Sequence, residues 1–201
     1  MTRVKICGMR RPEDIRYANE LGPDMIGFVF WKPSKRYVGP DVASELRSML
    51  DDGIIPVGVF VDEDPRVVAE IANDGTVDMV QLHGVEDEEY IHGLRKLTDV
   101  PIIRTFCVRS EADLVRASES STDMVLLDNG KGTGQTFDWT LMRDLGRDFI
   151  LSGGLSASNV GDAVRRFHPY AVDVSSAVET DGFKDRSKME QFIDAARSSR
   201  P

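Results

Sequence analysis

Two side chains that can exchange protons stand at the ends of apolar segments in this chain. The segment Val4–Cys7 ends in a thiol and runs into Gly8, and the segment Met124–Leu127 is followed by the carboxyl group of Asp128. Short apolar runs bounded in this way are typical of buried β-strands. A thiol and a carboxyl group at strand ends predict acid–base chemistry on a small molecule. An isolated cysteine also serves as a small buried hydrophobe, and Asp128 could cap the following loop, so structural roles stay open at this point.

Small and hydroxyl-bearing residues follow three of the apolar segments and could surround an anion. Glycines let backbone N–H groups approach a phosphate, and a helix N-terminus favours negative charge. In barrels of alternating strands and helices, phosphate sites are commonly built from the loops after the seventh and eighth strands. The residues predicted to bind phosphate are Gly132, Gly134, Gly153, Gly154, Ser175 and Ser176. The expected partner is therefore a phosphorylated small molecule.

Three further polar residues lie in or just after apolar segments and are candidates for binding the substrate. Arg36 follows Met25–Phe30, His83 directly follows Met79–Leu82, and Asp173 lies near the end of another apolar run. Arg36 could instead belong to a solvated basic loop, and His83 could be a turn residue. The spacing of histidine, cysteine and acidic residues does not match a zinc site, so no metal is expected.

The elements that must position these residues alternate regularly along the chain. The apolar segments predicted as strands are Val4–Cys7, Met25–Phe30, Ile54–Val61, Met79–Leu82, Pro101–Phe106, Met124–Leu127, Phe149–Leu151 and Ala171–Val174. The amphipathic segments predicted as helices are Pro12–Leu21, Val42–Leu50, Pro65–Asn73, Glu86–Leu97, Glu111–Ser118, Trp139–Leu145, Ser158–Phe167 and Lys184–Ala196.

This alternation predicts parallel strands joined by crossover helices, which is an α/β fold. Eight such units in 201 residues predict a (β/α)8 TIM barrel, with residues 1–201 forming a single domain. The carboxyl ends of the barrel strands would then bring the candidate residues together. An open doubly wound sheet is the alternative, but the first turn, Cys7-Gly8-Met9-Arg10, lacks the GxGxxG fingerprint of dinucleotide-binding folds.

Composition narrows the class of protein. Hydrophobic residues make up 41% and charged residues 29% of the chain, as in ordinary globular proteins, and the net charge is −9. A nucleic-acid surface would need a basic stripe, so no nucleic-acid partner is expected. No apolar run is long enough to span a bilayer, and the two cysteines do not form a disulfide framework. We expect a cytoplasmic monomer without a membrane partner.

The motifs around the candidate residues resemble the phosphoribosylanthranilate isomerase family of tryptophan biosynthesis. The resemblance runs in order from residue 3 to about residue 192. Its motifs are Val4-Lys5-Ile6-Cys7-Gly8, Gly58-Val59-Phe60-Val61, Gln81-Leu82-His83-Gly84, Leu127-Asp128 with Gly132-Thr133-Gly134 and Phe137-Asp138-Trp139, Leu151-Ser152-Gly153-Gly154-Leu155, and Asp173-Val174-Ser175-Ser176. The chain departs from the family at Ala177, where the family has glycine, and at Lys35, where many members have proline.

The resemblance implies a cofactor-free Amadori rearrangement of N-(5-phosphoribosyl)anthranilate, an aminoaldose, to an aminoketose. Asp128 matches the family's general acid and Cys7 its general base. Arg36 matches the arginine that pairs with the anthranilate carboxylate, and the glycine and serine loops match the phosphate site. The chemistry requires a raised pKa at Asp128, and a thiol whose pKa is lowered or which loses its proton as the substrate binds.

Strand geometry adds an expectation about Lys5. Side chains alternate along a strand, so Lys5 lies on the same side as Cys7 and one layer deeper. If Cys7 faces the mouth of the barrel, Lys5 needs a buried acidic partner, either Asp173 or Asp128. We expect Lys5 to lower the pKa of the thiol; the alternative is that Lys5 faces outward between helices.

Two other functions compete with this one. The related sugar isomerases of histidine biosynthesis share the barrel, but they are longer and carry an aspartate at the end of the first strand, where this chain has Cys7. A catalytically silent binder of phosphorylated ligands could use the same scaffold, and Ala177 favours it. Retention of both proton-transfer groups speaks against the binder.

Overall fold

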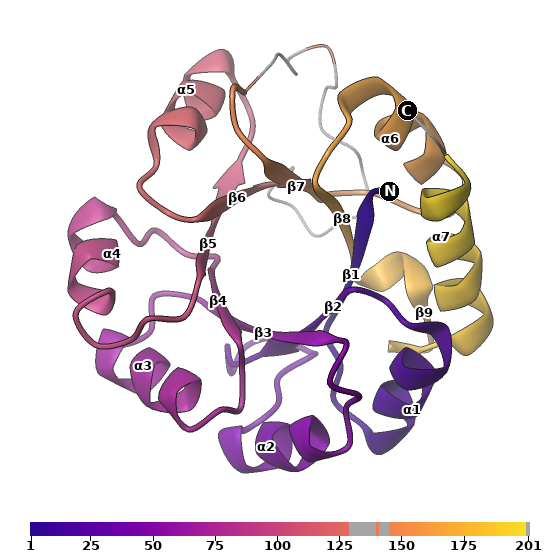
Figure 1. Ribbon diagram of the computed structural model, residues 1–201, viewed down its shortest axis with the longest axis horizontal. Helices are drawn as coiled ribbons and strands as arrows, with labels where there is room; N and C mark the ends of the chain where they lie inside the picture. Colours follow the sequence, from indigo (N-terminus) through magenta and orange to yellow (C-terminus); the bar gives the residue numbers. More distant parts are fainter. Residues whose placement is uncertain (129–139, 141–144, 200–201) are drawn as a thin grey trace.

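Eight parallel strands close into a barrel in the computed structural model, which describes residues 1–128, 140 and 145–199 (Figure 1). The strands are β1 (Arg3–Cys7), β2 (Met25–Val29), β3 (Ile55–Phe60), β4 (Met79–Leu82), β5 (Ile102–Cys107), β6 (Met124–Asp128), β7 (Phe149–Leu151) and β8 (Ala171–Val174). Each coincides with a predicted apolar segment to within one or two residues. The predicted (β/α)8 barrel is therefore confirmed, and the open doubly wound sheet is wrong.

Helices pack around the outside of the barrel (Figure 1). They are α1 (Pro12–Leu21), α2 (Pro40–Ser48), α3 (Pro65–Asn73), α4 (Glu88–Leu94), α5 (Glu111–Glu119), α6 (Val160–Phe167) and α7 (Arg186–Ser198). After β8 the chain adds the short helix η2 (Ser176–Val178) and a hairpin of β9 (Glu179–Thr180) and β10 (Phe183–Lys184). The segment Trp139–Leu145, predicted as a helix, lies almost wholly outside the described residues.

The largest difference from the predicted boundaries is at α4, which begins two residues later and ends three residues earlier than the sequence pattern predicts. The Glu86 carboxylate accepts hydrogen bonds from the backbone N–H groups of Asp62 and Gly84 instead of entering the helix. Asp87 caps the helix by accepting from the backbone N–H of Tyr90. The loop after β4, which carries His83, is thereby tied to the loop after β3.

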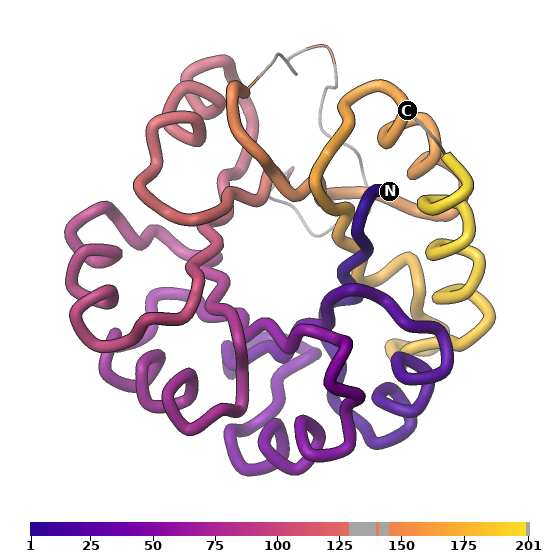
Figure 2. The backbone as a smooth tube through the Cα atoms, viewed as in Figure 1, coloured from indigo at the N-terminus to yellow at the C-terminus, as the bar shows by residue number. Residues whose placement is uncertain are grey.

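The barrel closes because β1 pairs with both β2 and β8. Figure 2 shows the chain passing once around the ring, so that its indigo beginning returns to its orange and yellow end. The main apolar core lies between strands and helices. A smaller cluster fills the barrel interior and consists of Met25, Val57, Ile103, Leu126, Ile150 and Ala171. This inner layer closes the barrel below the site, as a packed core rather than a pore.

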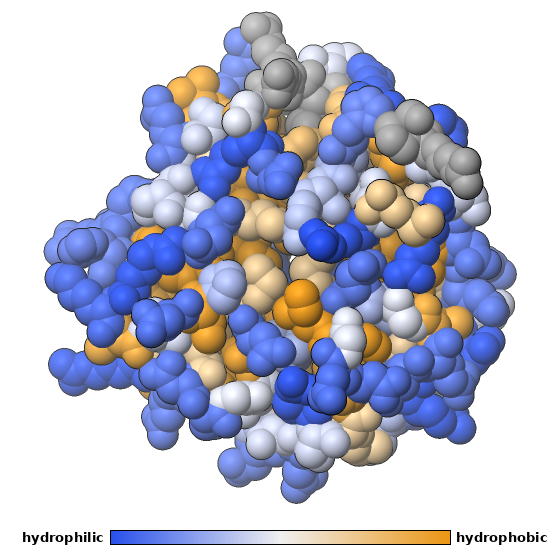
Figure 3. Space-filling view, viewed as in Figure 1, coloured by the Kyte–Doolittle hydropathy of each residue, from blue (hydrophilic) through white to orange (hydrophobic). Residues whose placement is uncertain are grey.

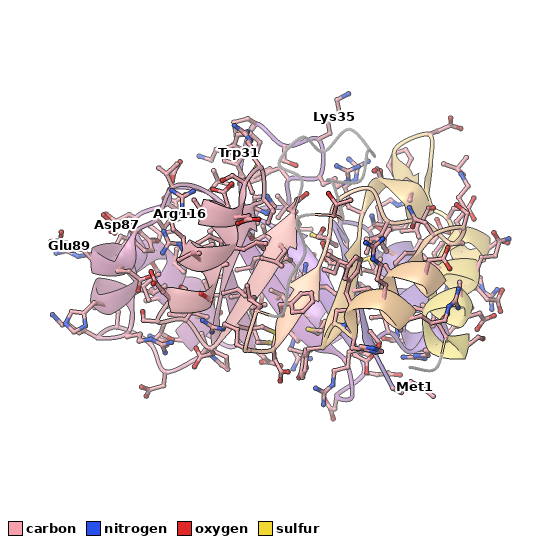
Figure 4. All side chains as sticks on the ribbon, turned by 90° about the horizontal axis from the view of Figure 1, so that it is seen from above. Met1, Trp31, Lys35, Asp87, Glu89 and Arg116 are labelled. Carbon is pink, nitrogen blue, oxygen red and sulfur yellow. The ribbon has the colours of Figure 1, made fainter. Side chains whose placement is uncertain are left out.

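The two ends of the barrel carry different parts of the chain. In Figure 4, Trp31 and Lys35, which follow β2, lie at one end, and Met1, which precedes β1, lies at the other. The outer rim of the face in Figure 3 is largely hydrophilic, as expected where amphipathic helices turn polar faces to water. Among the described residues, no helix has the length and apolar character to cross a membrane.

Candidate active site

A pocket of about 570 Å³ opens at the carboxyl ends of the strands. Every predicted site residue that the structure describes lines it. These residues are Cys7, Arg36, His83, Asp128, Gly153, Gly154, Asp173, Ser175 and Ser176. Gly132 and Gly134, also predicted to bind phosphate, lie outside the described residues. The barrel thus brings together groups that are up to about 170 residues apart in sequence.

Cys7 reaches the pocket from the last position of β1, where its neighbour across the sheet is Gly27 of β2. A Cβ atom built on Gly27 would lie 2.8 Å from Cys7 Sγ and 3.1 Å from Cys7 Cα. The absence of a side chain at Gly27 therefore makes room for the thiol. Gly8, which follows, adopts φ +90°, a conformation that favours glycine and turns the chain away from the barrel.

Lys5 is completely buried and bonds to a residue that lines the pocket, so it lies inside the barrel and the alternative that it faces outward between helices is wrong. Its ammonium group donates a hydrogen bond of 2.8 Å to Asp173 Oδ1, which confirms Asp173 as one of its two predicted partners. The other carboxylate oxygen, Asp173 Oδ2, accepts from Ser152 Oγ at 2.9 Å. A hydrogen-bonded ion pair therefore forms part of the pocket floor.

The pKa of Cys7 is raised above its ordinary value in the free protein. Burial of the thiol is the largest cause, and the positive charge of Lys5 opposes it more strongly than any other group. The negative charge of Asp173 raises the pKa of the thiol, and the positive charge of Lys184 lowers it. The simple expectation of a lowered thiol pKa is wrong for the unliganded site, because desolvation outweighs the cation. The positive charge of Lys5 does lower the pKa of the thiol, in the direction expected from the sequence.

Asp128 and His83 approach each other on the opposite part of the pocket wall. His83 Nε2 lies 3.8 Å from Asp128 Oδ2, which is too long for a hydrogen bond but close enough for electrostatic attraction if the ring is protonated. Gln81, buried in β4, places its amide nitrogen 3.2 Å from His83 Nδ1 and 3.2 Å from Thr105 Oγ1. If the amide donates to Nδ1, a neutral His83 ring carries its proton on Nε2, which faces Asp128.

Arg36 has a partner that the sequence did not reveal. Its Nε and Nη2 donate to the two carboxylate oxygens of Glu179, at 2.7 and 2.8 Å. Hydrogen bonding to Glu179 is the largest cause of a raised Arg36 pKa. Glu179 also accepts from the buried Lys184 at 2.7 Å. One bidentate edge of the guanidinium, formed by Nε and Nη2, is thus already used by a carboxylate of the protein. The only available sequence signal was the Asp181-Gly182 turn, which marks a hairpin after the serine doublet.

The other end of the pocket is formed by backbone of the loops after β7 and β8. Gly153 and Gly154 both have positive φ, +85° and +70°, in the segment that leads to α6. Asn159 fixes this segment by donating to the backbone oxygen of Gly154 at 3.0 Å. Ser175 Oγ donates to the backbone oxygen of Cys7 at 2.9 Å, which ties the loop after β8 to the end of β1.

No group of three or more histidine, cysteine or acidic residues suited to a metal ion occurs in the part of the chain that the structure describes. The chemistry that the described site residues can perform themselves is proton transfer, by Cys7 and Asp128, with positive charge from Lys5, Arg36 and Lys184 nearby.

Residues 4–195 match the family model described as N-(5'phosphoribosyl)anthranilate (PRA) isomerase. The N-(5'-phosphoribosyl)anthranilate isomerase of Caldanaerobacter subterraneus subsp. tengcongensis is 46% identical over 98% of this chain and 98% of the relative. The enzyme of the same name from Dechloromonas aromatica is 44% identical over 98% of this chain and 97% of its own length.

Solved structures agree in fold. Phosphoribosyl anthranilate isomerase from Thermotoga maritima superposes with a TM-score of 0.90 at 39% identity, covering 98% of this chain and all of that chain. A phosphoribosyl anthranilate isomerase in complex with reduced 1-(o-carboxyphenylamino)-1-deoxyribulose 5-phosphate gives a TM-score of 0.88 at 39% identity, with the same coverage. On the family model, these full-length identities and the shared barrel, the chain belongs to the N-(5'-phosphoribosyl)anthranilate isomerase family.

Proposed function

We propose that this protein isomerises N-(5-phosphoribosyl)anthranilate to 1-(2-carboxyphenylamino)-1-deoxyribulose 5-phosphate, a step of tryptophan biosynthesis. The observation that carries the proposal is the meeting of Cys7 and Asp128 in one pocket, with an arginine on its wall and the Gly153-Gly154 and Ser175-Ser176 loops beside them. These are a base, an acid, a carboxylate-binding group and an anion cradle, which is the set that this substrate requires.

The first step assigned to the site is opening of the ribose ring. Asp128 donates a proton to the ring oxygen as the bond from that oxygen to C1′ breaks, and the anthranilate nitrogen supplies the electron pair that forms a Schiff base. The close approach of His83 Nε2 to Asp128 supports this assignment, since the imidazole can stabilise the carboxylate that the step leaves.

The second step is removal of the C2′ proton by the Cys7 thiolate. The electron pair of that C–H bond moves into the C2′–C1′ bond and gives an enolamine, which becomes the ketone by proton loss from the C2′ hydroxyl and protonation at C1′. Because burial raises the pKa of Cys7 in the free protein, the thiol must ionise as the substrate binds. Lys5 supports that ionisation, since its positive charge lowers the pKa of Cys7.

The remaining contacts orient the substrate. Backbone N–H groups of Gly153, Gly154 and the Ser175-Ser176 segment are assigned to the 5-phosphate, and Arg36 to the anthranilate carboxylate. Asp173, which lines the pocket and pairs with Lys5, is assigned to a ribose hydroxyl. No cofactor is required, because the reaction is a redistribution of protons and electrons within one molecule.

Loss of the anthranilate fluorescence signal of freshly prepared phosphoribosylanthranilate on addition of purified protein tests the proposal. Complementation of a tryptophan auxotroph that lacks this isomerase separates it from its rivals. Growth with the wild type that is lost with Cys7→Ala supports catalysis, while absence of both growth and turnover supports a silent binder. Turnover of the histidine-pathway aminoaldose instead would identify the related sugar isomerase.

We also propose that the protein is a monomer. Large exposed apolar side chains in the described residues are spread over separate elements, such as Val42 in α2, Val67 in α3 and Val115 in α5. Monomers generated from the dimeric phosphoribosylanthranilate isomerase of Thermotoga maritima have a solved structure. Sedimentation equilibrium distinguishes the two states, and a mass of twice 22.4 kDa would contradict the proposal.

A further inference from the structure

Glu179 contacts the pocket arginine from behind, and it is not itself part of the described pocket lining. It lies at the start of the β9–β10 hairpin, directly opposite Lys184 in the antiparallel register. The two residues between the strands, Asp181 and Gly182, have φ +52° and +79°. Two consecutive positive φ values are those of a tight type I′ turn, so a rigid local structure sets the position of the carboxylate.

The tip of this hairpin is fixed to two other loops at the mouth of the barrel. Arg10 donates to the backbone oxygen of Gly182 at 2.7 Å and to that of Lys35 at 2.9 Å. The guanidinium carbons of Arg10 and Arg11 lie 4.6 and 4.3 Å from the centre of the Phe183 ring. Arg10 therefore links the tip of the hairpin to the loop that carries Arg36.

Arg36 is confined on two sides. A Cβ atom built on Gly8 would lie 2.5 Å from Arg36 Cδ, so the aliphatic part of the side chain packs directly over Gly8. The carboxylate of Glu179 accepts hydrogen bonds from Nε and from one N–H of Nη2. A guanidinium has five N–H donors, so those on Nη1 and the second on Nη2 are the ones left for a ligand in the pocket. Both the position and the orientation of the group are thus set before any ligand binds.

The charges around Glu179 are arranged to leave the pocket attractive to an anion. Burial alone would raise the pKa of Glu179, but hydrogen bonds from Arg36 and the charge of Lys184 outweigh it and keep the pKa below its ordinary value. Lys184 Nζ also donates to the backbone oxygen of Ser175, in the loop assigned to the phosphate. One carboxylate between two cations leaves one positive charge in excess.

We propose that Glu179 is a positioning residue for substrate recognition: it holds Arg36 in the orientation that receives the carboxylate of an aromatic amine ligand, and Lys184 balances its charge. The inference rests on the proposed function. A long arginine that is ordered in the free protein loses less conformational entropy when the ligand binds. Glu179 therefore favours ligands that carry the carboxylate over otherwise equal ligands that lack it.

The test measures Kd by calorimetry for two ligands with wild type and Glu179→Gln. One ligand is reduced 1-(o-carboxyphenylamino)-1-deoxyribulose 5-phosphate, and the other is the same molecule without the carboxyl group. Glu179→Gln should raise the Kd of the ligand with the carboxyl group by about 10-fold, which is the effect of losing one charge-assisted contact. It should change the Kd of the ligand without that group by less than about 2-fold. In turnover, KM should rise about 10-fold with kcat within about 3-fold, because the contact is equal in ground and transition states.

Three further variants separate positioning from a purely structural role. Glu190→Gln makes the same change in net charge on α7, where Glu190 pairs with Arg186, and should leave both Kd values unchanged. In an Arg36→Met background, Glu179→Gln should have no further effect on the carboxylate ligand. Glu179→Asp keeps the negative charge, so it should retain more of the preference for the ligand that carries the carboxyl group than Glu179→Gln does. If the Glu179→Gln protein does not fold, Glu179→Asp takes its place in the comparison.

Equal weakening of both ligands by Glu179→Gln, or an undiminished effect in the Arg36→Met background, would overturn the positioning role while leaving the proposed function intact. A wild-type protein that neither binds the carboxylate ligand nor turns over the substrate would overturn both. The two failures are therefore distinguished by the wild-type measurements alone.

Discussion

Lys5 Nζ lies 2.8 Å from Asp173 Oδ1 in the interior of the barrel, two residues before Cys7 on the same face of β1. The two residues are register partners in neighbouring strands β1 and β8, so the pairing is set by the closure of the barrel. Burying two charges is costly unless both are paired and hydrogen-bonded. Within this pair, the charge of Lys5 lowers the pKa of Cys7 and the charge of Asp173 raises it, so only the lysine favours ionisation of the thiol.

Replacing Lys5 by methionine is expected to raise the pKa of the Cys7 thiol further, because the strongest cause that lowers it is removed. The pH dependence of alkylation by iodoacetamide measures that pKa, in a Cys107→Ala background so that one thiol reacts. The free energy of unfolding should fall by about 3–5 kcal/mol, because Asp173 is left buried and unpaired.

The double variant Lys5→Met/Asp173→Asn serves as the control for that experiment. It removes the unpaired charge, so part of the lost stability should return. It also removes a negative charge that raises the Cys7 pKa, so the alkylation pKa should rise less than with Lys5→Met alone. An alkylation pKa that does not change in Lys5→Met would show that Lys5 does not tune the thiol.

The raised pKa of Cys7 predicts a loss of stability at alkaline pH. Above about pH 8.5 the unfolded thiol releases its proton while the folded thiol retains it. The folded state then binds more protons than the unfolded state, so the free energy of unfolding falls as pH rises through the folded pKa. Urea unfolding between pH 7.5 and 9.5 should show a shallower decline in Cys7→Ala than in the wild type. Parallel declines in the two proteins would contradict this.

Removing either proton-transfer group should abolish chemistry but not binding. Cys7→Ala and Asp128→Asn are each expected to lower kcat by about 10²- to 10⁴-fold. The Kd of the reduced product analogue should change by less than about 5-fold, since these groups act mainly on the reacting bonds. Cys107→Ala is the matched thiol control and should keep its activity. Comparable loss of turnover in Cys107→Ala would point to misfolding or to a different base.

Gly27→Ala is expected to displace Cys7. The new Cβ would lie 3.1 Å from the backbone of Cys7 as well as 2.8 Å from its sulfur, so a rotation of the thiol alone does not relieve the contact. The free energy of unfolding should fall by about 1–3 kcal/mol, as for an overpacked core, and kcat should fall at least about 10-fold.

Gly93→Ala is the natural comparison for that substitution. Gly93 lies within α4, and a Cβ there meets no atom within 4 Å. Alanine is a better helix former than glycine, so the free energy of unfolding of this variant should rise by about 0.5–1 kcal/mol, with no loss of kcat. Thermal unfolding and steady-state kinetics on both proteins check the pair of predictions. Unchanged kcat in Gly27→Ala would show that the thiol position tolerates that shift.

Much of this protein follows from the sequence alone. The spacing of apolar residues determines eight short strands, and the proline and acidic residues at helix starts determine where α1, α3 and α5 begin, whereas the other described helices begin two residues from the predicted positions. The position of Cys7 and Asp128 at strand ends predicts that they meet, because the carboxyl ends of parallel barrel strands share one edge. Even the inward side of Lys5 follows from strand alternation, since a residue two positions before Cys7 must share its face.

Only the tertiary structure decided which groups pair and how their charges balance. The choice of Asp173 as partner of Lys5 depends on the register of β1 with β8, which lies 168 residues away and leaves no local trace in the sequence. The pairing of Arg36 with Glu179 depends on how a hairpin folds over the barrel mouth. The raised pKa of Cys7 depends on burial as well as on neighbouring charge. Register, loop packing and desolvation are properties of the folded chain, and for that reason local sequence patterns do not fix them.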